Sequence, residues 1–77
     1  METGFVLIRT APTKEHEVYG ELRKVKGIVE LHPLFGEYDF IAKIEATDFD
    51  AMERVVVDQI RAIKGVITTK TLPSSRL

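Results

Sequence analysis

The sequence predicts a small α+β domain in which one strand-helix-strand unit is used twice. Residues 22–29 match residues 60–67 position by position, and each segment has a lysine, then a glycine, and then β-branched residues. This pattern is typical of a helix end that passes through a left-handed glycine into a strand. Apolar residues alternate in residues 38–45, which is typical of a strand, and they recur at helical spacing in residues 52–63, which is typical of a helix. The predicted element order is βαββαβ.

The first predicted strand covers residues 5–10. Phe5 and Leu7 fall on one alternating face, and Val6 and Ile8 fall on the other. A run that is apolar on both faces is typical of a strand that is buried on both sides. We therefore expect two layers of protein to cover this strand.

The first predicted helix follows a short proline-containing turn and begins after Thr13, which is in position to cap it. Val18, Leu22 and Val25 recur at helical spacing and form the predicted core stripe. Gly27 ends the helix, and the lysines just before it suit the negative end of the helix dipole. The first half of the chain thus predicts a short amphipathic helix that packs on the sheet.

The middle of the chain predicts a pair of strands joined by a turn. The second strand, residues 28–35, contains Pro33, and a proline cannot donate to the ladder, so we expect an edge strand or a bulge. A turn over residues 36–39 leads into the third strand, residues 40–46. Side chains alternate in character along that strand, so its two faces see different environments.

The second predicted helix opens at residues 47–48, where Asp48 or Asp50 serves the N-terminal amides and the helix dipole. Its predicted buried stripe consists of Met52, Val55, Val56, Ile60 and Ile63. Gly65 ends this helix, and residues 66–72 form the last strand. We expect the polar tail, residues 73–77, to fray.

Right-handed crossovers place both helices on one face of a four-stranded antiparallel sheet, with the first and third strands in the centre, as in ferredoxin-like folds. The other face is left uncovered. The chain has 77 residues and no cysteine, and a domain this short buries only roughly 60% of its unfolded surface. A second copy, stacked sheet against sheet, is the simplest cover, so the sequence predicts a sheet-paired dimer.

Composition excludes several classes of partner. The net charge of −1 gives no basic face for direct contact with nucleic acid. The longest apolar run, residues 5–8, is too short to span a membrane, and no signal peptide is recognisable, so we expect a cytoplasmic protein without membrane contact. Gly4 and Gly20 lack a phosphate-binding pattern, and no cofactor is expected.

The segment Gly36-Glu37-Tyr38-Asp39 carries the most suggestive chemistry. Alternation would put the carboxylates of Glu37 and Asp39 on the same side of the strand, on either side of Tyr38. Such a pair suits the ammonium group of a small ligand. The alternative is ordinary turn chemistry, because glycine and aspartate are common turn residues.

Threonines and histidines are the remaining polar candidates. Thr68, Thr69 and Thr71 could offer hydroxyl groups to a ligand carboxylate, or they are simply good strand formers. His16 and His32 have no metal-ligand or nucleophile partner at a recognisable spacing, so no metal site or catalytic residue is predicted. His32, next to a proline on the edge strand, is a candidate for an interface or a pocket.

Taken together, these residues resemble the RAM domain, the C-terminal ligand-binding module of the Lrp/AsnC regulators of amino-acid metabolism. The matching segments are residues 5–8, 25–30, 35–46, 60–66 and 69–71. The most specific part is the Gly-Glu-Tyr-Asp core followed by alternating apolar residues. The resemblance covers nearly the whole chain, so residues 1–77 are expected to form a single RAM domain.

The resemblance implies a βαββαβ fold, pairing through the sheets, and assembly of dimers into rings of the octamer or decamer type. It also implies that an effector amino acid binds between dimers. In that site Gly36, Tyr38 and Asp39 would shape the pocket, with Asp39 opposite the ammonium group of the ligand. Thr69 and Thr71 would offer hydroxyl groups.

Full members of the family begin with a helix-turn-helix domain, whereas this chain starts almost directly on its first strand. We therefore expect a stand-alone amino-acid sensor. One alternative is an adaptor that forms mixed oligomers with a full-length Lrp/AsnC regulator. Another is a cofactor-free isomerase or oxygenase in which His32, Glu37 or Asp39 acts as the base. No arrangement of base, orienting group and oxyanion donors is recognisable, so we expect binding and not catalysis.

Overall fold

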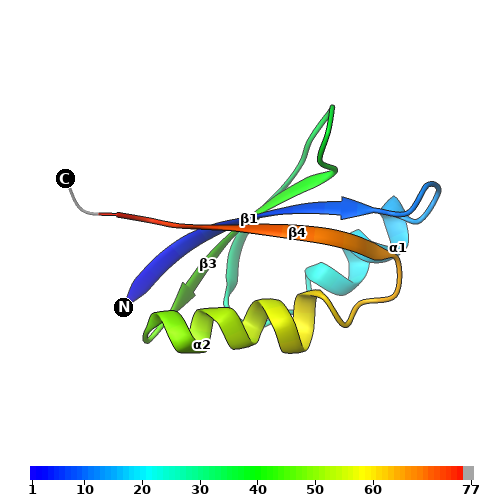
Figure 1. Ribbon diagram of the computed structural model, residues 1–77. Helices are drawn as coiled ribbons and strands as arrows, with labels where there is room; N and C mark the ends of the chain where they lie inside the picture. The colour runs from blue at the N-terminus through cyan, green and yellow to red at the C-terminus, as the bar shows by residue number, and fades with distance from the viewer. Residues whose placement is uncertain (76–77) are drawn as a thin grey trace.

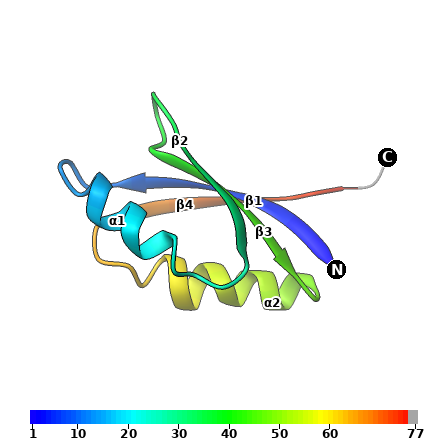
Figure 2. The same cartoon turned by 180° about the vertical axis from the view of Figure 1, so that it is seen from behind.

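The fold is a four-stranded antiparallel sheet in the order β2-β3-β1-β4, with the helices on one face (Figures 1 and 2). A computed structural model describes residues 1–75. Its elements are β1 (Glu2–Thr10), α1 (Glu15–Leu22), β2 (Ile28–Pro33), β3 (Phe40–Ala46), α2 (Phe49–Arg54), η1 (Val55–Ile60) and β4 (Val66–Pro73). The predicted βαββαβ order and the central position of β1 and β3 are confirmed.

The core lies between the helices and one face of the sheet. It consists of Val6, Ile8, Val18, Leu22, Phe40, Ala42, Ile44, Met52, Val56 and Ile60. Val25, Val55 and Ile63 pack against it as half-buried residues. The residues of both predicted stripes therefore contact the core, although Val25 and Ile63 lie beyond the ends of α1 and η1. Burying one large apolar side chain contributes about 1.5–3 kcal/mol, and this layer therefore supplies the main driving force for folding.

The two halves share the connection from helix to strand. Val25 N donates to Leu22 O, and Ile63 N donates to Ile60 O, both at 3.1 Å. The glycines that follow have φ of +103° and +105°, the left-handed region predicted for them. The helices nevertheless end before the lysines, and neither α1 nor η1 has a basic residue in its last turn. The predicted dipole role of these lysines is wrong, because a turn separates each helix from its glycine.

The two helices begin differently. Asp48 caps α2, because its side chain accepts a hydrogen bond from Ala51 N at 2.7 Å, as predicted. The prediction that Thr13 caps α1 is wrong. Lys14 N donates to Ala11 O at 3.0 Å, and this tight turn holds Thr13 at a φ of +69°. The cap position of α1 falls on Lys14, which makes no side-chain cap.

The α2 helix continues into η1 with a wider, π-type turn. Arg61 N donates to Val56 O at 2.8 Å, a bond that spans five residues. This register keeps Met52, Val56 and Ile60 against the sheet over the whole helix. None of the helices in residues 1–75 is long and apolar enough to span a membrane.

The edges of the sheet are β2 and β4. Because of Pro33, β2 was predicted to be an edge strand or to contain a bulge. It lies at the edge of the sheet, and its register shifts between Ile28 and Glu30, so both features are present. Residues 73 and 74 belong to the tail that was predicted to fray, and both are hydrogen-bonded or paired with β1. Pro73 pairs with Gly4, and Ser74 bonds to Thr3 O through its backbone at 3.0 Å and its hydroxyl at 2.7 Å. Residues 76–77 lie outside the described part of the chain.

Candidate functional site

The loop between β2 and β3 (the β2–β3 loop, residues 34–39) fixes one carboxylate at the end of β1. Asp39 N donates to Ile8 O at 2.8 Å. Its carboxylate oxygen Oδ2 accepts from both Thr10 N at 2.7 Å and Thr10 Oγ1 at 3.1 Å. Leu34 N closes the loop by donating to Asp39 O at 2.8 Å, and Gly36 allows the turn with a φ of +126°. The other oxygen, Oδ1, accepts no hydrogen bond from the protein within residues 1–75.

Asp39 borders a hollow of about 610 Å³ between α1 and the β2–β3 loop, which we term the β2-side hollow. It is lined by Glu15, His16, Tyr19, Pro33, Leu34, Phe35, Gly36, Asp39 and Phe40. The rings of Tyr19 and Phe40 lie 5.7 Å apart and form its aromatic wall. A carboxylate beside an aromatic wall suits a ligand that has both an ammonium group and an apolar part.

Glu37 and Tyr38 take no part in this hollow. Arg9 donates from Nε to Glu37 O at 3.0 Å and from Nη2 to Glu37 Oε2 at 3.2 Å. The same guanidinium lies 5.4 Å from the ring centre of Tyr38. The prediction that Glu37 and Asp39 share one side is wrong, because they lie in a loop and bind consecutive residues of β1, whose side chains point to opposite faces.

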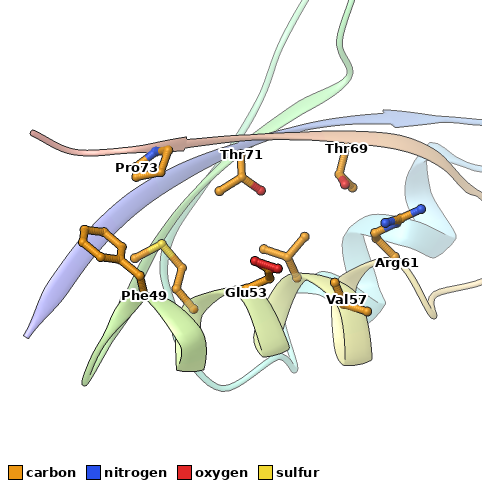
Figure 3. A pocket seen from close by; sticks show the side chains of 9 residues that line it. Phe49, Glu53, Val57, Arg61, Thr69, Thr71 and Pro73 are labelled. Atoms are coloured by element: carbon orange, nitrogen blue, oxygen red, sulfur yellow. The ribbon is translucent and has the colours of Figure 1, made fainter.

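The two predicted threonines line a different hollow, of about 510 Å³, between α2 and β4 (Figure 3), which we term the β4-side hollow. It is lined by Phe49, Met52, Glu53, Val56, Val57, Arg61, Thr69, Thr71 and Pro73. Thr69 and Thr71 point from β4 toward the helix, where Glu53 and Arg61 face them (Figure 3). The hollow thus offers a guanidinium, a carboxylate and two hydroxyl groups above an apolar floor.

Sequence reasoning missed the helix side of the β4-side hollow. Phe49, Glu53, Val57 and Arg61 recur every four residues and share one face of the helix. This period lies beside the buried stripe and could have been found from the sequence. It was hidden because these side chains mix apolar and charged types, which by themselves suggest a solvated face.

The predicted ligand-binding residues are not gathered within one chain. Asp39 and Gly36 border the β2-side hollow, whereas Thr69 and Thr71 border the β4-side hollow. Strands β2 and β4 are the opposite edges of the sheet, and β1 separates β3 from β4. Thr68 alternates with the other threonines and faces away from α2.

The face of the sheet opposite the helices (the open face) is partly apolar. Phe5 pairs with Leu72, and Leu7 pairs with Ile41. Phe5 and Leu72 are 37% and 42% exposed, respectively, and Leu7 is half-buried, so the second apolar set of β1 is only partly covered within a single chain.

Charged groups border the open face on β2 and β3. Glu30 Oε1 hydrogen-bonds His32 Nε2 at 3.2 Å, and Lys43 Nζ lies 3.5 Å from Glu30 Oε2. The hydrogen bond with His32, followed by the charge of Lys43, holds the pKa of Glu30 below its ordinary value of 4.5.

His32 lies outside both hollows. Residues 1–75 contain no cluster of three side chains suited to bind a metal ion.

Comparison with known proteins identifies the family. A family model described as the Lrp/AsnC ligand binding domain matches residues 3–76. This chain belongs to that family. An uncharacterized HTH-type transcriptional regulator of Pyrococcus abyssi is 35% identical to this Lrp/AsnC domain over 75 residues, which are 94% of the chain and 50% of that protein. The chain thus spans about half the length of the curated relatives it matches, and the predicted resemblance is confirmed.

Solved structures support the same assignment of the fold. The crystal structure of FFRP-DM1 is similar to this Lrp/AsnC domain with a TM-score of 0.91 at 31% identity, and the match covers 97% of this chain and 100% of that one. A transcriptional regulator of Neisseria meningitidis in complex with L-Met has a TM-score of 0.86 at 19% identity, over 97% of this chain and 50% of that one. At the second identity the likeness concerns the fold alone.

Proposed function

We propose that this Lrp/AsnC domain is a homo-oligomeric sensor that binds an amino acid. The observation that carries the proposal is the Asp39 carboxylate, which is fixed by Thr10 through one oxygen at the border of an aromatic hollow. A fixed carboxylate binds an ammonium group without losing side-chain freedom on binding. Oxygen Oδ1 of Asp39 is the proposed acceptor for the ligand.

The hollows favour an amino acid with an apolar side chain. Tyr19 and Phe40 would contact that side chain in the β2-side hollow. Arg61 and the hydroxyl groups of Thr69 and Thr71 provide donors for the carboxylate of the ligand. L-Met, which is bound in the structure of the Neisseria regulator, has this combination of groups and is therefore the first amino acid to test.

The separation of the two hollows supports a site that two copies of the chain complete. One copy would contribute the β2–β3 loop with Asp39, and a second would contribute the β4-side hollow. Sheet-to-sheet pairing through Phe5, Leu7 and Leu72 would form the dimer, and contacts between sheet edges would join dimers into the predicted octamer or decamer type of ring.

Native mass spectrometry with each of the twenty amino acids, beginning with L-methionine, tests the proposal. Asp39→Asn keeps an acceptor for Thr10 but removes the charge, so we expect binding to weaken by about tenfold or more while the oligomer persists. Asp50→Asn, an exposed aspartate on α2, is the matched control. The proposal fails if no amino acid binds, or if Asp39→Asn binds as tightly as the wild-type chain.

A second function is favoured by the relatives themselves. They are HTH-type regulators of about twice this length, so the same sheet face could pair this chain with a longer regulator. Purification of the tagged chain from its own cells, followed by mass spectrometry, separates the two proposals. A longer partner carrying the same domain supports the adaptor, and an assembly made only of this chain contradicts it.

Binding in place of catalysis is part of the proposal. Its support is the dispersal of the candidate bases: His32 bonds to Glu30 outside both hollows, and Glu37 bonds to Arg9. Turnover of any amino acid or 2-oxo acid that is lost in both His32→Ala and Asp39→Asn would contradict this part.

A further inference from the structure

Three consecutive residues of β1, 8–10, hold residues 37–39 of the β2–β3 loop. Asp39 bonds to Ile8 and Thr10, as described above. Arg9, which lies between them, makes three further contacts with the loop. Its Nε donates to Glu37 O at 3.0 Å, its Nη2 contacts Glu37 Oε2 at 3.2 Å, and its guanidinium covers the Tyr38 ring at 5.4 Å. These contacts therefore hold the loop against the end of β1 immediately before Asp39.

Arg9 and Thr10 connect the two faces of the sheet. Arg9 alternates with Thr10 along β1, so it shares the open face with Phe5 and Leu7. Thr10 is only 6% exposed, and it holds Asp39 at the border of the β2-side hollow. One short segment thus has contacts on the open face and, one residue later, in the ligand site proposed above.

We propose that Arg9 is a positioning residue for Asp39 and couples the covering of the open face to ligand binding. The second part rests on the proposed function. In a single chain the Arg9 side chain is 40% exposed and that of Glu37 is 73% exposed, and an ion pair in water stabilises little. A second copy that covered the open face would exclude water from this pair and raise the attraction between its charges, because charges interact more strongly in a medium of lower dielectric constant. The same coupling makes the ligand favour the dimer.

Amide hydrogen exchange tests the positioning role without any ligand. The reporters are the amide of Thr10, which donates to the Asp39 carboxylate, and the amide of Asp39, which donates to Ile8 O. In Arg9→Met we expect both to exchange about threefold to tenfold faster, the factor that loss of an exposed ion pair and a cation–π contact allows. The amide of Ala11, which bonds to Gly65 O on the other side of the strand end, should keep its rate.

Two further variants separate positioning from a general loss of stability. Arg9→Lys keeps the charge but loses the planar fork, so intermediate exchange rates are expected. Arg54→Met, which removes an exposed arginine on α2, should leave the rates of both reporter amides unchanged. Unchanged rates at Thr10 and Asp39 in Arg9→Met would overturn the positioning role, as would equal acceleration at Ala11.

The coupling is tested by protein concentration. Above the dimer dissociation constant, the wild-type amides of Thr10 and Asp39 should exchange more slowly than below it, and Arg9→Met should lose about threefold or more of this difference. Equal differences in the two proteins would overturn the coupling. L-methionine affinity, measured by calorimetry, then reports on the ligand. If the wild type does not bind it, the proposed function loses its first ligand, whereas the exchange data still decide the role of Arg9.

Discussion

The two halves of the chain have the same plan but begin their helices by different means. At the helix ends they agree in detail, because the same backbone bond links Val25 to Leu22 and Ile63 to Ile60 before a left-handed glycine. At the helix starts they differ, because Asp48 caps α2 and no side chain caps α1. The repeat therefore governs features that the backbone and glycine determine, whereas single side chains decide the rest.

The largest expected effect tests whether the halves share one core. Leu22 and Ile60 occupy matching positions of the repeat, and both are fully buried. Each substitution by alanine should reduce the free energy of unfolding by about 2–5 kcal/mol. Urea unfolding at one fixed protein concentration measures this, with Gln59→Ala as the exposed control. A large loss in only one of the two variants would show that the halves do not bury these positions equally.

The second prediction separates the two matching glycines. Alanine at a positive φ is strained, so Gly27→Ala and Gly65→Ala should each cost about 1–3 kcal/mol. The cost should be larger at Gly65, where an added Cβ would lie 2.9 Å from Val18 Cγ2; at Gly27 the nearest atom would be 3.5 Å away. Thermal unfolding of both variants measures the difference. A greater loss for Gly27→Ala would contradict the packing described here.

The third prediction concerns the helix starts. Asp48→Ala removes a cap and should cost about 1 kcal/mol. Thr13→Gly relieves a positive φ before the uncapped helix and should gain at most about 1 kcal/mol. Asp50→Ala is the control, because Asp50 lies in the same first turn without being the cap residue. If Thr13→Gly destabilised the chain, the backbone at that position would not be strained.

The smallest effect concerns the edge strands. Glu30 in β2 has a lowered pKa, so its charged form stabilises the fold above pH 4.5, and this contribution is lost as the pH falls below that value. His32→Ala should move the Glu30 pKa back toward 4.5, because the hydrogen bond from His32 is the largest cause. An NMR titration of the Glu30 carboxyl group measures this. Thr68→Ala, at the position of β4 that matches Glu30 in the repeat, should leave the titration unchanged.

The fold could be predicted from the sequence because its signals are local or periodic. The stripe through Met52 and Ile60 identified the second helix, and Pro33 identified an edge strand. Thr13 was misassigned because the same residue type can cap a helix or sit in a turn. Only the bond between Ala11 and Lys14 decides between these conformations.

The chemical groups of the site could be predicted from the sequence, but their arrangement in space could not. Asp39 could be selected from its motif, but its distance from the threonines depends on the order of the strands. The contact between Arg9 and Glu37 joins residues 28 positions apart, and no period in the sequence connects them. Arg61 escaped notice because it contributes to a hollow only once α2 lies beside β4.

Both ends of the described chain leave the sheet at one place, since Gly4 pairs with Pro73 and Ser74 bonds to Thr3. Tension applied through these ends would act across the β1–β4 ladder. It would separate the paired residues of the ladder one after another, because the hydrogen bonds of an antiparallel pair lie perpendicular to the strands. The ladder between β1 and β4 is consequently the mechanically weak part of the fold. The far end of β1, where the β2–β3 loop bonds to it, would be the last part of that strand to bear the load.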